Sequence, residues 1–205
     1  MFDDDVNHIS LVFSDLMSND TKGGLGEAIY GYVARFSFVD IGLLAEALQY
    51  EISVLPSPYR EMVGPYMEEE LLGRYNRVLA MHSDGSFERM TGKIRDKPLF
   101  DDFCRMAIGF GADLQESGDC CGHHMQLGGL SYFLLHCFAL FVLDEPGHPV
   151  GMPVLGGFKV RVQEGRFYCP ARAREKAEDL SLCRFCPAEE EDLYGNWCAA
   201  RGYVL

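Results

Sequence analysis

The sequence predicts a mainly α-helical protein (α+β), in which a helical body is followed by a small β-hairpin and a cysteine-rich metal module. Apolar residues recur at helical spacing through the first half of the chain. Residues 145–157 (EPGHPVGMPVLGG) hold three prolines and four glycines, so this segment cannot be helical. Beyond it, apolar and polar residues alternate, which is typical of strands. These three observations define the fold class.

Length and composition predict one compact unit with two parts. The chain has 205 residues, of which 48% are hydrophobic, so it can bury a substantial core and is not disordered. We expect a helical body over residues 1–145 and a hairpin and cysteine module over residues 146–205, packed together as one domain.

The first helices of the body are predicted from apolar periodicity. The spacing predicts helices over Val6 to Met17 and over Glu27 to Phe36, with a glycine-rich link between them. Asp40 precedes the next apolar stripe, which runs to Ile52. We expect this aspartate to cap the third helix, because its carboxylate can accept hydrogen bonds from free main-chain N–H groups.

The fourth helix is predicted to begin at Pro58, since proline suits the first turn of a helix. The pair Gly64-Pro65 lies inside it and should kink the helix or split it in two. After a polar turn, the spacing predicts a shorter amphipathic helix over residues 100–108.

One segment has the composition of a membrane span but not its length. Leu127 to Leu143 is apolar over 17 residues, interrupted by Ser131, Tyr132 and His136. A span needs about 20 apolar residues and basic flanks, and this segment has neither. We therefore expect the central buried helix of the body here, and no association with a membrane.

A β-hairpin is predicted directly after the proline-rich segment. Residues 158–162 alternate apolar and polar side chains, Glu164-Gly165 predicts a turn, and Arg166 to Cys169 form the returning strand. Further on, the four acidic residues 189–192 are interpreted as the solvated start of a helix.

Charge and the N-terminal residues restrict the partners and the compartment. The net charge of −13 opposes sequence-independent binding to nucleic acid. The opening residues MFDDDVNHISL lack the basic start and apolar stretch of a signal peptide, so we expect a cytoplasmic protein. Thiols stay reduced in that compartment, and eight cysteines then indicate metal binding rather than disulfides.

The most specific chemical pattern is Cys169-x13-Cys183-x2-Cys186. A C-x2-C pair places two thiolates on one tight turn, where both can reach one metal ion. The predicted hairpin carries Cys169 at the end of a strand, a rigid position for a third ligand. Three ligands leave a fourth to be found. The candidates are His148 just before the hairpin, Cys198, and the pair Cys120-Cys121 with His123 and His124.

The pattern fits two kinds of metal centre. Zinc is the usual ion for a small knuckle with three or four thiolates. An iron–sulfur cluster also takes thiolates, and a ligand cysteine followed by proline, as at Cys169 and Cys186, occurs in ferredoxin-type motifs. Cys104 and Cys137 lie on apolar helical faces and are expected to be core thiols.

Three segments resemble the C-terminal signature of a known family: GHPVGMPVLGGFKV (147–160), FYCPARAREK (167–176) and LCRFCPAEEED (182–192). They are similar to an uncharacterised protein family of methanogenic archaea, a conserved domain of unknown function. The resemblance implies an anaerobic cytoplasm, which permits iron–sulfur clusters, and it implies no particular activity. The signature includes His148 beside the three cysteines and so favours His148 as the fourth ligand. This chain departs from the family pattern at Met152, Val154 and Leu155.

The favoured function is that of a non-enzymatic accessory or interaction protein with a cysteine-rich metal centre and a protein partner. No phosphate-binding loop, dinucleotide fingerprint or nucleophile motif is present, so no catalytic residue is assigned. Two alternatives stay open: an iron–sulfur protein for electron transfer, and a metal-dependent enzyme with an open ligand position.

Overall fold

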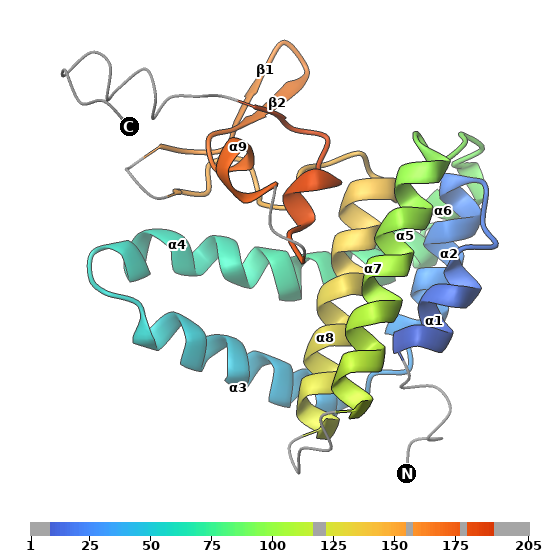
Figure 1. Cartoon of the computed structure of the whole chain (residues 1–205), viewed down its shortest axis with the longest axis horizontal. Helices are drawn as coiled ribbons and strands as arrows, with labels where there is room; N and C mark the ends of the chain where they lie inside the picture. The colour runs from blue at the N-terminus through green and yellow to red at the C-terminus, as the bar shows by residue number, and fades with distance from the viewer. Residues whose placement is uncertain (1–8, 117–121, 155–157, 177–179, 191–205) are drawn as a thin grey trace.

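The computed structural model describes residues 9–116, 122–154, 158–176 and 180–190. These residues form a mainly helical structure with a small sheet near the C-terminus, as the sequence predicts (Figure 1). The helices and helical turns are, in chain order, α1 (Ile9–Leu16), α2 (Lys22–Val33), α3 (Phe38–Val54), α4 (Tyr59–Glu68), η2 (Glu69–Gly73), α5 (Arg74–Ser83), α6 (Ser86–Arg89), α7 (Lys97–Glu116), α8 (Gly122–Cys137), η3 (Phe138–Val142), α9 (Arg172–Glu175) and η4 (Leu182–Arg184). The strands are β1 (Arg161–Gln163), β2 (Arg166–Cys169) and β3 (Glu189–Glu190).

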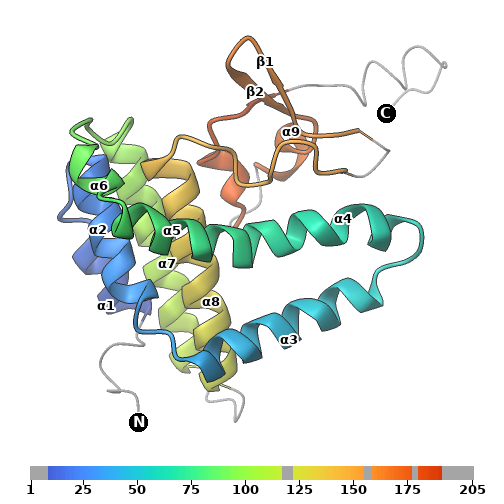
Figure 2. The same ribbon diagram turned by 180° about the vertical axis from the view of Figure 1, so that it is seen from behind.

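The helices form a bundle with an arm. Helices α7 and α8 lie side by side at the centre, and α1 and α2 pack on one side of them (Figures 1 and 2). Helices α3 and α4 pair with each other and extend to the other side, and the sheet with α9 lies beyond α4 (Figure 2). We call α3 and α4 the arm. The sheet and α9 therefore lie next to both the bundle and the arm (Figure 2).

Helix α2 begins earlier than its periodicity predicts. The Thr21 hydroxyl accepts a hydrogen bond from the main-chain N–H of Gly24 at 3.2 Å, and the helix includes the glycines that the sequence places in a link. A Cβ at Gly26 would lie 2.4 Å from the Phe87 ring. Glycine is needed at this position because an aromatic ring packs directly on the helix backbone, so Gly26 serves packing and not a turn.

Helix α3 is capped by a different residue from the one predicted. Ser37 is the N-cap, and Asp40 is the third helical residue. The Asp40 N–H donates to Ser37 Oγ at 3.2 Å, and the Ser37 N–H donates to Asp40 Oδ2 at 2.7 Å. The pair is a reciprocal capping box, in which each side chain satisfies the free donor of the other residue.

The chain from Tyr59 to Ser83 is one continuous helical run, so Gly64-Pro65 does not split the helix, and the kink that was the other expectation stays a prediction. Proline removes one main-chain donor, and α4 continues through it to Glu68. The regular hydrogen-bonding pattern is interrupted four residues later, by the π-helical turn η2. Turns of this kind are frequent at functional sites.

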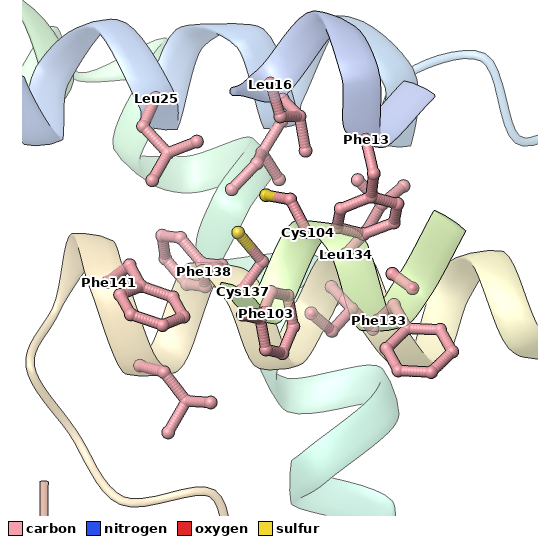
Figure 3. Packing of buried hydrophobic residues seen from close by; sticks show 14 of the residues in the cluster. Phe13, Leu16, Leu25, Phe103, Cys104, Phe133, Leu134, Cys137, Phe138 and Phe141 are labelled. Carbon is pink, nitrogen blue, oxygen red and sulfur yellow. The ribbon is translucent and has the colours of Figure 1, made fainter. Parts of the chain in front are cut away.

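The predicted central helix is confirmed, and it forms the main core. Phe133, Phe138 and Phe141 of α8 and η3 are at most 3% exposed and pack against residues of α1, α2 and α7 (Figure 3). Cys104 and Cys137 lie within this core, as their apolar surroundings predict (Figure 3). Among the described residues no single helix is long and apolar enough to cross a membrane, although α2 and α3, bent by 95°, meet that criterion as a pair.

The predicted hairpin is confirmed, with a third strand that was not predicted. β1 and β2 pair antiparallel through a turn at Glu164-Gly165, where both residues have positive φ. β3 pairs with β2 in parallel, so the interpretation of Glu189 and Glu190 as a helix start is wrong. Arg166 forms an ion pair with Glu189 at 3.4 Å across the two strands. Pairing with a distant strand, which local sequence cannot show, determines this conformation.

The C-terminal module attaches to the rest of the chain in two ways. A second, smaller hydrophobic cluster, the module core, joins α4 to the sheet; its buried members are Val63, Met152, Val160, Cys169 and Ala188. In addition, Phe185 enters the main core, where its ring centroid lies 5.3 Å from that of Phe103 at 89°. The division of the chain at residue 145 stays a prediction.

Replacing Phe185 by alanine should remove the strongest apolar anchor of the module. The side chain is fully buried, so we expect Phe185→Ala to lower the free energy of unfolding by about 3–5 kcal/mol. Urea unfolding followed by circular dichroism measures this change. The matched control is Val162→Ala in β1, which is 51% exposed and should change stability by less than about 0.5 kcal/mol. Equal effects in both variants would contradict the anchoring role.

Candidate thiol and imidazole site

A cavity of about 650 Å³ lies between α8, the segment after η3 and the C-terminal module. We call it the thiol cavity, because three cysteines line it together with two histidines: Cys169, Cys183, Cys186, His136 and His148. The four residues predicted as metal ligands are all in this set. The fold brings these residues together from four separate segments. They are β2, the region of η4, helix α8 and the segment between η3 and β1, which we call the linker.

The three thiols come from two elements. Cys169 ends β2 and is 3% exposed. Cys183 lies in the 3₁₀ turn η4, where its N–H donates to Ser181 Oγ at 3.2 Å, and Cys186 follows directly after the turn. Phe185 stands between the latter two and is held in the main core, so the C-x2-C turn is fixed against the helical body.

Burial makes two of these thiols, those of Cys169 and Cys183, harder to ionise. It raises the pKa of Cys183, and the neighbouring Cys169 and Cys186 raise it further. Burial also raises the pKa of Cys169, although the main-chain N–H groups of Ala171 and Arg172 face its sulfur and lower that pKa in part. Those N–H groups are suited to stabilise a thiolate once it forms.

His136 is a member of the site that sequence reasoning missed. It is 5% exposed on α8, and its Nδ1 lies 2.8 Å from the main-chain oxygen of Tyr132. Nδ1 therefore carries the proton, which leaves the lone pair on Nε2. Burial lowers the pKa of His136 well below its ordinary value, and the charge of Arg74 lowers it further. The sequence does contain a signal for this residue, namely a histidine inside a 17-residue apolar run. Burying an imidazole is costly unless it has a polar partner, so a buried histidine is a candidate site residue.

His148 lies in the linker between η3 and the sheet and lines the same cavity. Burial lowers its pKa below the ordinary value, and Arg74 adds to this effect. Both imidazoles are therefore neutral at pH 7, which is the form that can donate a lone pair.

Arg74 places a positive charge behind the cavity. It is 7% exposed, and its Nη2 donates to the main-chain oxygens of Pro146, at 3.2 Å, and Gly147. Its Nη1 has no hydrogen-bond partner among the described residues. Cys186 is close enough to interact electrostatically with this guanidinium. Any negative charge that develops on the thiols is therefore compensated from nearby.

The donors share one cavity but are not arranged for coordination. Across the part of the chain that the structure describes, no three His, Cys, Asp or Glu side chains form a group that could hold a metal ion. The five cysteines of this part are all free thiols. The other proposed ligands, Cys120, Cys121 and Cys198, lie outside the described residues, and so do the side chains of His123 and His124.

A second cavity of about 300 Å³ adjoins the first one. It lies between α3, η2 and α8, and we call it the Glu70 cavity. Tyr132 and His136 line both cavities and form the wall between them. Glu70 Oε1 is buried without a hydrogen-bond partner among the described residues. Burial raises the pKa of this carboxyl to about 7, even though Arg74 lowers it in part.

Comparison with known proteins places the chain among archaeal sequences. The model of a family described as "Uncharacterized protein conserved in archaea (DUF2115)" matches residues 21–191. A UPF0305 protein of Methanothermobacter thermautotrophicus is 43% identical over 53 residues, which cover 26% of this chain and 32% of the relative. A UPF0305 protein of Methanopyrus kandleri is 39% identical over 54 residues, which cover 26% of this chain and 38% of the relative.

The chain therefore spans about a third of the length of the curated relatives it matches. No solved structure is significantly similar to it.

The buried carboxyl of Glu70 should reduce stability at neutral and alkaline pH. Its folded pKa of about 7 exceeds the ordinary value of 4.5, so the folded chain holds a proton that the unfolded chain releases between these pH values. Stability is thus lost as pH rises through this window. Glu70→Gln, which cannot ionise, should be more stable than the wild type by up to about 3 kcal/mol at pH 8 and by almost nothing at pH 4.5.

Urea unfolding at the two pH values measures this difference. Glu69→Gln is the matched control, because Glu69 lies on the same turn and is exposed. A stability gain at pH 8 that is equal in the two variants would contradict the effect of burial.

Proposed function

This chain belongs to the DUF2115 family of uncharacterised archaeal proteins, as its sequence resemblance predicts, and from that premise we propose that it binds a metal ion in the thiol cavity. The proposed ligands are the thiolates of Cys169, Cys183 and Cys186 and the imidazole of His148. The observation that carries the proposal is that all four side chains, from three separate segments of the chain, line one cavity. Three thiolates and one imidazole are a zinc-binding set.

The charge around the cavity supports a thiolate centre. Three thiolates and a divalent ion together carry one net negative charge. The guanidinium of Arg74 lies nearby with one nitrogen unpartnered among the described residues, and it interacts with Cys186. Burial opposes ionisation of the free thiols of Cys169 and Cys183, and a bound ion would stabilise their thiolates.

Coordination requires the side chains to move closer together than they are, since they form no ready group. Metal binding commonly completes a site in this way, because the binding free energy contributes directly to folding. The ion would then connect the hairpin, the η4 turn and the linker. Such a role is structural, and it fits an accessory protein in a reducing compartment, such as the cytoplasm, that presents the module to a protein partner.

An iron–sulfur cluster is the second candidate, and one observation favours it. The cavity of about 650 Å³ is far larger than a single ion requires. Thiolates are the ordinary ligands of such clusters. The same spare volume would accommodate a substrate beside a metal ion with an open position, which is the third possibility.

Elemental analysis of protein purified without oxygen tests the proposal. We expect about one zinc per chain and no visible colour; several irons with acid-labile sulfide would favour the cluster. Cys183→Ser should lose the metal and lower the melting temperature, because a bound ion stabilises the folded state. The matched control is Cys104→Ala, whose thiol is buried in the main core; it should keep the full metal content.

The result that contradicts the proposal is a wild-type protein without zinc or iron that also fails to bind added zinc. Full metal retention in Cys183→Ser would contradict the assigned ligands.

A further inference from the structure

The Glu70 cavity has the composition of a binding site for a small molecule. Its walls are mainly aliphatic, and they come from the arm and from the central helix. A volume of about 300 Å³ is at the lower end of the range for ligand cavities. The apolar lining residues are Leu44, Ala47, Leu48, Met67, Leu71 and Leu135.

The charged groups in this lining are all acidic. Glu70 lies in the wall and Glu51, which is exposed, also lines the cavity, whereas no lysine or arginine is among the described lining residues. Tyr132 adds an aromatic ring, whose face attracts cations. A positively charged ligand therefore has favourable interactions with these lining groups, although the buried Arg74 also acts electrostatically on Glu70.

One carboxylate oxygen of Glu70 is buried without a hydrogen-bond partner among the described residues. Its Oε1 accepts no hydrogen bond from the described residues, and Arg74 influences it electrostatically without a direct ion pair. A buried carboxylate in this condition is costly for stability. The π-helical turn η2, which carries Glu70, is itself an irregularity of a kind common at functional sites.

We propose that the Glu70 cavity binds a small organic amine, whose ammonium group pairs with the Glu70 carboxylate and whose apolar body packs against the leucines of α3 and α8. This site is separate from the proposed metal centre and does not depend on it. The unsatisfied carboxylate is then explained as a recognition group, retained at the expense of stability.

Ligand-detected NMR with benzylamine as the probe tests the proposal on the full chain at pH 8. Benzyl alcohol has the same ring and a similar size without the charge, and it serves as the matched ligand. We expect saturable binding of benzylamine, at least about tenfold tighter than that of benzyl alcohol. Glu70→Gln should weaken benzylamine binding at least about tenfold, and Glu69→Gln should leave it within about twofold.

A second variant tests the location without changing any charge. Ala47 is exposed and lines the cavity from α3, so Ala47→Phe should fill the cavity while the helix stays intact. We expect this variant to lose benzylamine binding and to keep the melting temperature of the wild type.

Three results would overturn the proposal. The first is the absence of saturable benzylamine binding up to about 10 mM, which is weak even for so small a ligand. The second is benzyl alcohol binding as tightly as benzylamine. The third is unchanged benzylamine binding in Glu70→Gln or in Ala47→Phe, because the amine would then bind elsewhere.

Discussion

The buried guanidinium of Arg74 is the interaction on which the arrangement of the molecule depends. It begins α5 and donates to two carbonyl oxygens of the linker, those of Pro146 and Gly147, so it holds the segment that leads from the helical body to the sheet. It also interacts electrostatically with Glu70 and with Cys186. Removing a buried arginine from water is expensive, and these carbonyl and acidic partners offset that cost. A single charge therefore acts on side chains that line both cavities.

Buried apolar residues form two cores of unequal size. The main core lies within the bundle, and the module core lies between α4 and the sheet. Cys186 packs against both of them. The thiol cavity is thus located where two separately packed regions meet, which is a common position for ligand sites. Packing in both cores therefore positions the residues that line the cavity.

The sequence predicts the parts of this structure that depend on local pattern. Helical periodicity, the turn at Glu164-Gly165 and the buried run at 127–143 follow from spacing alone. The cysteine pattern, with the help of a family resemblance, also identifies four side chains that line one cavity. Their capacity to hold metal is a separate matter and stays a prediction.

Features that depend on distant contacts could not be predicted. The strand at Glu189 forms because β2 is available as a partner, and Gly23 and Gly26 of α2 lie closely packed against Phe87, a residue distant in the sequence. In the sequence, His136 is an interruption of an apolar helix. Only the folded chain shows that it lines the thiol cavity. Glu70 follows two other glutamates in the sequence and has no pattern of its own, and the π-helical turn that carries it is not visible in the sequence. In each case the deciding neighbour is far away in the sequence.

The burial of Phe185 has a consequence for how reagents reach the thiols. Cys183 and Cys186 flank this ring, so a movement that carries the turn away from the body must also withdraw the ring from the main core. Exposing a phenylalanine costs about 3 kcal/mol, which limits such an opened state to about one molecule in 150. Alkylation or oxidation that depends on this opening would be slow and would affect the two thiols together. For any reagent that needs this opening, the reaction rate therefore depends on an aromatic contact with α7.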